Sequence, residues 1–527
     1  MTTALLERRF LADYARTGTN ILLLVLIPVT FVIVAAPTLA DAAKVLGGAH
    51  EGPGIETVTA GWAAAFLTGI AMYFQVASSR ASDRRLILAG QSPGRLAVAR
   101  LVTGAGLAAA ATIAALSALA ARQGWADPAR LIAGTAMFAI VYLAIGAVIG
   151  AVVPTAVNGT VLLLFVWILD VFFGPTLSGS TSPLLRVLPT HFISLWTVNQ
   201  PPEHGGPAAL VWSGLWVVGA LAVAYRVVAA TAPAKSRSVA TSGTASARES
   251  RQRFPKPPRS PSQFRTEFAM AVKDWQRTPL LWALLAAVPA VFILLSAAIT
   301  PHGRSRVVVR EAGVQVTAIV DPAVIHPGTM APEAIASLAA LVGVFVVLDA
   351  RAADRRLVLA GQRPAAAVAT RIAMVMMASV LVSGVSLALT ATVFTAERWT
   401  VYALGSLILA LTYGLMGMLL GPLFGRVSGV FLAFLLPLID LGLGQSPMLG
   451  GDPADWALWI PGYGGMRLLI DGGLTPTFDE GAMLLVALGW IAVLMCAVLA
   501  LLRRIINCPI PGRRSDGSSI GSSVRAR

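Results

Sequence analysis

The sequence Arg80-Ala-Ser-Asp-Arg-Arg-Leu-Ile-Leu-Ala-Gly-Gln-Ser-Pro93 returns later in the chain as Arg351-Ala-Ala-Asp-Arg-Arg-Leu-Val-Leu-Ala-Gly-Gln-Arg-Pro364. The two stretches, here called the Arg-rich elements, match at 11 of 14 positions and lie 271 residues apart. Each follows one hydrophobic segment and precedes another. The pattern therefore predicts a tandem duplication that holds the same polar element twice at one membrane face.

The overall composition excludes a soluble globular enzyme. Hydrophobic residues make up 56% of the 527, charged residues 12%, and the mean hydropathy is +0.76. These values are typical of a polytopic helical membrane protein. The net charge of +15 is spread between apolar segments and the C-terminal end, which favours lipid headgroups over nucleic acid as the partner. Two cysteines and five scattered histidines predict neither a disulfide framework nor a metal site.

Twelve apolar windows are long enough to cross about 30 Å of hydrocarbon as helices, so we expect an all-α polytopic membrane protein. The first window lacks a small-residue cleavage site and is expected to be a retained span, not a signal peptide. Six windows fall in each half of the chain. They are 20–40, 58–77, 97–120, 131–153, 158–173 and 208–230, then 280–300, 335–348, 366–394, 400–420, 428–443 and 482–502.

The domain organisation follows from these windows. Because each half holds an even number of spans, both halves run in the same direction, which predicts two parallel six-helix repeats about a pseudo-two-fold axis along the membrane normal. Basic loops, linker and tail place both termini in the cytoplasm. Stretches 5–16 and 264–277 are amphipathic and are expected to lie along the inner leaflet. The expected parts are a first repeat (1–230), a disordered basic linker (231–263), a second repeat (264–506) and a tail (507–527).

Further residues repeat at the same offset of 271. They include a Gly-x-x-x-Gly pair in the fourth span of each half, a spacing that allows close helix approach. The matched residues are Gly134, Tyr142, Gly146 and Gly150 with Gly405, Tyr413, Gly417 and Gly421.

One carboxylate ends the fifth span of each half, Asp170 in the first and Asp440 in the second. A carboxylate within a membrane is a functional-site hypothesis by default. The alternative, which we favour, is that each caps the short helix that follows, within segments 174–207 and 444–481.

The energy source is expected to lie outside the chain. None of its four lysines follows a glycine, so Gly-Lys-Ser/Thr and with it a phosphate-binding P-loop do not occur. The chain is thus expected not to be an enzyme. The predicted spans also hold no mid-span carboxylate or histidine of the kind that a proton relay uses.

An amphipathic helix, six spans, an Arg-rich short helix between spans 2 and 3 and further helices between spans 5 and 6 together resemble the permease subunit of type V ABC exporters. The duplicated form resembles the tetronasin-resistance type of multidrug-efflux permease in actinobacteria. The resemblance covers nearly the whole chain. It implies a permease of a bacterial plasma membrane that exports hydrophobic or amphipathic small molecules such as drugs, polyketide antibiotics or lipids. ATP and magnesium would be held by a separate cytoplasmic ATPase, with no cofactor in this chain.

The resemblance also assigns roles to residues. The Arg-rich elements become short coupling helices that insert into a cleft of the ATPase, and their near identity predicts two copies of one ATPase; binding to lipid headgroups is the alternative. The coupling residues would be Arg80, Asp83, Arg84, Arg85, Leu86, Leu88, Arg351, Asp354, Arg355, Arg356, Leu357 and Leu359. The substrate path would lie between the halves, with Met72, Phe74, Gln75, Phe165, Asp170, Phe172, Phe431, Phe434 and Asp440 as candidates.

Two other classes of protein stay open. A proton-coupled secondary multidrug transporter of the major facilitator type also has twelve spans in two parallel halves. Its Gly-x-x-x-Asp-Arg-x-Gly-Arg pattern is missing around Asp83, as are the mid-span ionisable residues. A membrane-embedded transferase acting on lipid-linked substrates would need a cluster of acidic or histidine residues near one face, and the sequence offers only isolated candidates.

Overall fold

The computed structural model of the chain describes residues 7–12, 18–46, 52–125, 127–153, 155–178, 183–198, 206–232, 261–311, 314–447 and 455–507. The predicted linker and tail lie almost entirely outside these residues, as do parts of the first amphipathic stretch.

Helices form nearly all of the described chain. The first half contains α2 (Gly18–Leu46), α3 (Gly52–Leu88), α4 (Pro93–Gln123), α5 (Pro128–Val152), α6 (Ala156–Phe173), α7 (Pro175–Ser178), η1 (Pro183–Val187), α8 (His191–Val198) and α9 (Pro207–Thr231). The second half contains α10 (Pro261–Gln276), α11 (Pro279–Ile299), β1 (Ser305–Glu311), β2 (Val314–Val320), α12 (Pro322–Leu359), α13 (Pro364–Thr390), α14 (Trp399–Pro437), η2 (Leu438–Gly444), η4 (Asp455–Trp459), α15 (Tyr463–Leu474) and α16 (Gly481–Asn507).

Nine helices of the described chain are long and apolar enough to cross a membrane, and α2 and α11 hold shorter apolar stretches. The chain is therefore a helical, polytopic membrane protein. Every predicted window overlaps a helix, and two of them share α14. That helix is interrupted at Gly425, whose φ of 79° is outside the helical range.

The expected all-α class agrees with this helical content, and the one addition is a β-hairpin that joins α11 to α12. Strands β1 and β2 pair antiparallel, from Ser305 opposite Val320 to Glu311 opposite Val314. Both strands are rich in valine, which favours extended backbone. Windows chosen to find twenty-residue spans do not register seven-residue strands.

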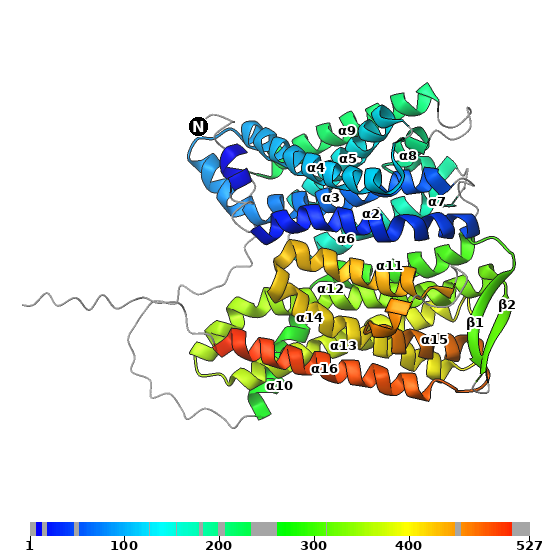
Figure 1. Cartoon of the computed structure of the whole chain (residues 1–527). Coiled ribbons are helices and arrows are strands. Elements are labelled where there is room, and N and C mark those ends of the chain that lie inside the picture. The colour runs from blue at the N-terminus through cyan, green and yellow to red at the C-terminus, as the bar shows by residue number, and fades with distance from the viewer. Residues whose placement is uncertain are drawn as a thin grey trace, which may run out of the picture.

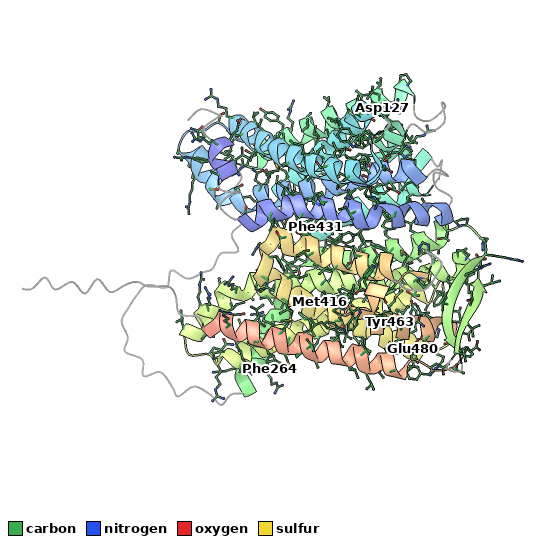
Figure 2. All side chains as sticks on the ribbon, viewed as in Figure 1. Asp127, Phe264, Met416, Phe431, Tyr463 and Glu480 are labelled. Atoms are coloured by element: carbon green, nitrogen blue, oxygen red, sulfur yellow. The ribbon has the colours of Figure 1, made fainter. Side chains whose placement is uncertain are left out.

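The two halves lie side by side, with their long helices running along a shared direction (Figure 1). The hairpin stands at one end of the bundle, together with α7, α8 and α15. The opposite end carries α10 and the last turns of α16. The ends of α3 and α12, which hold the Arg-rich elements, lie there too, and we call it the Arg-rich end. Figure 2 shows the same polarity, with Phe264 of α10 and Glu480 at opposite ends.

The closest helix contact in each half joins two long helices, α3 with α5 in the first half and α12 with α14 in the second. A Cβ built on Gly146 in α5 would lie 2.2 Å from the carbonyl oxygen of Gly69 in α3. A Cβ on Gly417 in α14 would lie 2.0 Å from the carbonyl oxygen of Ala340 in α12. Both partners keep the offset of 271. Glycine is needed at these positions because even one methyl group would overlap backbone.

Changing Gly417 to Ala should therefore lower the free energy of unfolding by about 1–3 kcal/mol, the usual cost of overpacking. Gly384 in α13 is the matched control, since a Cβ there meets nothing within 4 Å. Its change to Ala should be neutral or slightly stabilising, because Ala favours helix. Thermal unfolding of the purified proteins in detergent measures both, and equal effects would contradict the packing described.

Candidate functional site

The sequence predicts that the Arg-rich elements are separate short helices, but they are the last turns of α3 and α12. Helix α3 runs without interruption to Leu88 and α12 to Leu359. The chain then turns at Gly90 (φ 90°) and Gly361 (φ 100°), and Pro93 and Pro364 begin the next helices.

The turn after each element is a Schellman motif. The amide of Gln91 donates to the carbonyl of Leu86 (3.0 Å), and that of Gly90 to Ile87 (2.9 Å). Gly361 and Gln362 make the same pair of bonds in the second half. The motif needs a left-handed residue one position past the helix, which explains the glycine in both elements.

A buried ion pair fixes each helix end to the helix that follows. The guanidinium of Arg100 in α4 donates to both carboxylate oxygens of Asp83, at 2.6 and 3.3 Å. Arg371 in α13 does the same to Asp354, at 2.5 and 3.1 Å. All four side chains are at most 13% exposed. Two parallel bonds to one carboxylate fix orientation as well as distance.

These bonds correct the predicted coupling set. Asp83 and Asp354 face inward and are not available to a partner. Arg80 is also engaged, because its guanidinium donates to the carbonyls of Gly150 and Val153 at the end of α5.

The remaining coupling candidates differ in exposure. Arg84 and Leu86 are half-buried, and Arg355 is half-buried with a 3.4 Å bond to the carbonyl of Ile505. Leu88 and Leu359 are 77% and 76% exposed, so each helix ends in an outward-facing leucine. The outward set at the Arg-rich end is Arg85, Leu88, Arg351, Arg356, Leu357 and Leu359.

Helix α10 packs against the second Arg-rich element. Glu267 of α10 accepts hydrogen bonds from Gln362 and from the guanidinium of Arg371 (3.3 Å). Burial raises the pKa of the Glu267 carboxyl above its ordinary 4.5, although Arg371 opposes the shift. In the first half, Phe10 takes a comparable place, with its ring centroid 3.6 Å from the guanidinium carbon of Arg100.

A cavity of about 1070 Å³ opens beside α10 at the Arg-rich end. Its wall combines α10, the end of α12 and the start of α6, so both halves contribute. Lining residues include Asn158, Glu267, Met270, Phe345, Asp349 and Arg371.

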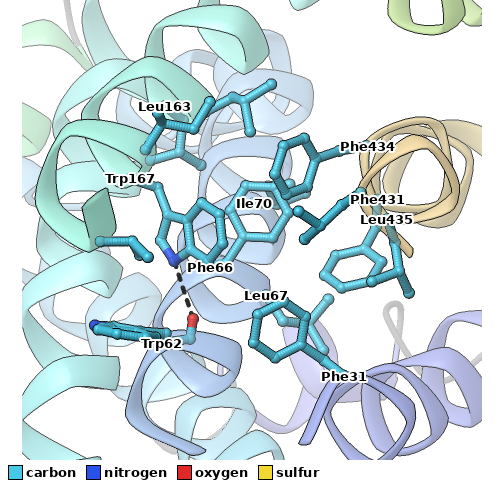
Figure 3. Packing of buried hydrophobic residues seen from close by; sticks show 14 of the residues in the cluster. Phe31, Trp62, Phe66, Leu67, Ile70, Leu163, Trp167, Phe431, Phe434 and Leu435 are labelled. Atoms are coloured by element: carbon cyan, nitrogen blue, oxygen red, sulfur yellow. Dashed lines mark hydrogen bonds between the residues drawn. The ribbon is translucent and has the colours of Figure 1, made fainter. Parts of the chain in front are cut away.

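Between the halves, deeper in the bundle, aromatic rings meet in a closed cluster that we call the central junction (Figure 3). The ring of Phe66 in α3 lies 5.3 Å from Phe431 and 5.4 Å from Phe434, both in α14. Trp167 of α6 lies 4.8 Å from Phe66 and 5.4 Å from Phe434. All four residues are at most 2% exposed. Such pairs contribute about 0.5–1.5 kcal/mol each beyond area burial.

The predicted path residues divide between the junction and other places. Phe431 and Phe434 belong to the junction, where Figure 2 also labels Phe431 between the halves. Phe172 crosses between the halves to Phe292 of α11, with 6.0 Å between ring centroids.

The other path candidates pack within the first half. Met72 is buried beside Gly104 of α4, and Phe74 packs on Tyr73. Phe165 is half-buried, while both polar atoms of the Gln75 amide are buried without a hydrogen-bond partner. The sequence did not mark Phe66 and Trp167, because apolar residues in a span look alike until their neighbours are known.

Asp170 and Asp440 are buried and bonded in the same way in both halves. Asp170 accepts from the hydroxyl of Tyr142 (3.0 Å) and from the amide of Thr190 (3.1 Å), just before α8. Asp440 accepts from the hydroxyl of Tyr413 and the amide of Gly462 (3.1 Å), just before α15. Asp170 thus ties the start of α8 to α5 and α6, and Asp440 ties the start of α15 to α14 and η2.

The expectation that the spans hold no interior carboxylate was wrong. Glu333 lies eleven residues inside α12 and is 2% exposed. The predicted window began at 335 and so left this residue outside the span. His326 in the same helix is also buried, with its Nδ1 2.5 Å from the hydroxyl of Thr300.

No metal-binding group of three or more His, Cys, Asp or Glu occurs among the described residues. No protein-family model matches the sequence, and no curated protein gives a significant match.

Removing one member of a buried pair should cost far more than removing one of an exposed pair. We expect Asp354→Ala to lower the free energy of unfolding by about 3–5 kcal/mol, because Arg371 would remain buried near fewer acceptors. Asp349→Ala in the same helix is the control, since its 2.6 Å pair with Arg426 is about half exposed. That change should cost about 1 kcal/mol or less. Equal losses of stability on thermal unfolding of the two variants would contradict the role of the Asp354–Arg371 pair in holding α12 to α13.

Docking of α10 should weaken as pH rises. A carboxyl whose pKa is higher in the folded state than in the unfolded state stabilises the folded state when it is protonated. This stabilisation is complete below pH 4.5, the ordinary pKa of the carboxyl, and is lost as the pH rises through the pKa of the folded state. Hydrogen exchange of the α10 amides, corrected for intrinsic rates, should show this loss in the native chain and not in Glu267→Gln. Asp274→Asn, at an exposed site of the same helix, should keep the native pH profile.

Proposed function

We propose that this chain is the transmembrane permease of an ATP-driven exporter, and that a separate cytoplasmic ATPase drives it. The observation that carries the proposal is the pair of matching helix ends. At one end of the bundle, α3 and α12 each present an exposed Arg and Leu surface, and each is held in place by the same buried ion pair. Lipid headgroups accept many arrangements of arginine, whereas a shaped protein cleft requires a fixed one.

The likeness of the two ends favours two copies of one ATPase. Both helix ends have the same Schellman turn, the same buried Asp–Arg ion pair and the same exposed leucine, so two identical clefts can bind them. Magnesium and ATP belong to these partner subunits, because this chain carries no P-loop.

The proposal includes a specific topology of twelve spans in two parallel six-helix repeats, related by an axis along the membrane normal. It is supported by contacts that recur at an offset of 271, including the glycine contacts and the ion pairs. Basic residues at the Arg-rich end, including Arg503 and Arg504 of α16, favour a cytoplasmic location for that end and for both termini, in a bacterial plasma membrane.

The cargo is a hydrophobic or amphipathic small molecule. The central junction is aromatic and aliphatic on both sides, and the cavity beside α10 joins polar and apolar walls at the Arg-rich end. We infer that the cavity admits substrate and that the junction opens during transport.

A second candidate is a proton-coupled secondary transporter. The buried Glu333 favours it, because a carboxylate inside a span is what a proton relay uses. The first candidate is preferred because it gives both exposed Arg and Leu surfaces a partner to bind.

The decisive experiment is co-purification with the ATPase encoded by a neighbouring reading frame, followed by ATP hydrolysis in lipid nanodiscs. The chain alone should not hydrolyse ATP, and the complex should do so faster when lipophilic drugs are added. Drug efflux that follows the proton gradient and needs no ATPase would support the second candidate instead.

Within that complex, changing Arg85, Leu88, Arg356 and Leu359 to Ala should reduce ATPase binding about tenfold or more, since the outward anchors are lost. Arg503→Ala with Arg504→Ala is the matched control, because these exposed arginines lie at the same end and outside the elements. The control should bind normally. Equal loss in both variants would mean that the arginines serve as lipid anchors.

Native mass spectrometry of the complex should find two identical ATPase subunits for each permease chain. Two different ATPase chains bound to one permease would refute the proposed symmetry of docking.

A further inference from the structure

The two halves share their packing contacts but differ where α12 meets η2. At the offset of 271, Trp62 and Phe66 of α3 correspond to Glu333 and Ser337 of α12. One half therefore places two aromatic rings at this depth, and the other places a carboxylate and a hydroxyl. The packing that the two halves share does not require this difference. The polar pair in the second half therefore points to a function of that half alone.

Glu333 is buried without a visible counter-charge. Its carboxylate lies against η2, where a Cβ on Gly442 would stand 2.9 Å from Oε2. Its Oε1 has no hydrogen-bond partner. No ion pair of the described residues includes it, whereas Asp83, Asp354 and Glu480 all have arginine partners.

Two further buried acceptors lie in α12 and just after η2. Ser337 is one helical turn from Glu333 on the same face, and its hydroxyl has no partner. Gln445 directly follows η2, and its amide oxygen is also unpartnered, although its amide nitrogen donates to Asp440. Glu333 and Ser337 in α12 and Gln445 just after η2 thus leave three acceptors unsatisfied, in side chains that are at most 4% exposed.

The backbone differs between the halves at the same place. The end of α6 is regular α-helix through Phe173, whereas η2 is a seven-residue π-helix. Such stretches are rare and occur often at functional sites. Helix η2 follows Phe431 and Phe434 along the chain and contacts α2 of the first half, so it adjoins the central junction.

In this low-dielectric environment the carboxyl either takes up a proton or, when ionised, needs a cation beside it. Leaving it uncompensated in a low-dielectric interior is costly, and a partner with several N–H donors would satisfy the acceptors together. A protonated amine has up to three such donors. The aromatic rings of the adjoining central junction suit an organic cation better than a metal ion, since ring faces attract ammonium groups and the described residues hold no metal-binding cluster.

We propose that Glu333, with Ser337 and the amide oxygen of Gln445, recognises the cationic amine of an amphipathic substrate whose apolar body packs on the central junction. This inference rests on the proposed function and names the class of cargo. Only the second half carries the charge, so the substrate binds in one orientation, with its amine toward α12 and its apolar body toward Trp62 and Phe66.

The test measures dye binding by the purified full chain in nanodiscs, without any ATPase, by fluorescence anisotropy. The probes are rhodamine 6G, a lipophilic cation with N–H donors, and Nile red, a neutral dye of similar character. Glu333→Gln should weaken rhodamine 6G binding about tenfold or more, as expected for loss of a charged hydrogen bond, and leave Nile red binding unchanged. Glu333→Asp should retain most of the affinity for the cation.

The control is Glu397→Gln, which removes an exposed carboxylate from the same half and should change neither affinity. The proposal is overturned if Glu333→Gln leaves rhodamine 6G binding intact, if it weakens both dyes equally, or if the native chain does not prefer the cation. Melting temperatures of all variants show that the comparison is made on folded protein.

This outcome is independent of the exporter proposal. Charge-selective binding without any ATPase response would leave the amine site standing and refute the energy source. An ATPase response with no charge selectivity in dye binding would support the exporter proposal and refute the amine site.

Discussion

The structure depends on the close approach of two backbones in each half. In a membrane, lipid is as apolar as a leucine side chain, so helices do not associate by hiding apolar surface. They associate where they can come near, and Gly146 and Gly417 allow α5 and α14 to touch the backbone of α3 and α12. Once these pairs are set, the Arg-rich ends of α3 and α12 are fixed in direction and the faces that form the central junction point inward.

Polar bonds then secure what the glycines bring together. Asp170 and Asp440 join three elements each, through a tyrosine of the fourth span and an amide before a short helix. Asp83 and Asp354 each join two helices at the other end, through an arginine of the next helix. These carboxylates have donors around them, and their positions agree between the halves. Glu333 lacks such donors and has no matching carboxylate in the first half. The fold therefore requires the four Asp residues but does not require Glu333.

The proposed function follows from the division of the molecule into a rigid end and a tightly packed middle. The Arg-rich end presents two similar surfaces held by short, charge-assisted bonds, which suits the transmission of force from a partner. The junction is held by aromatic contacts that are each weak, so the halves can separate there without breaking an ion pair. The cavity beside α10 lies at the Arg-rich end and is walled by both halves.

The sequence by itself determined the membrane class, the helical windows and the recurrence of the Arg-rich elements, because these depend on composition, period and local pattern. It marked Gly146 and Gly417 through their spacing. It did not reveal that Asp83 faces Arg100, that the Arg-rich elements continue long helices, or that Glu333 lies inside a span without a partner. Those facts depend on contacts between side chains that are far apart in the sequence, and a local sequence pattern does not predict such contacts. Only the tertiary structure decided them, and the β-hairpin, short and set between two spans, was decided there as well.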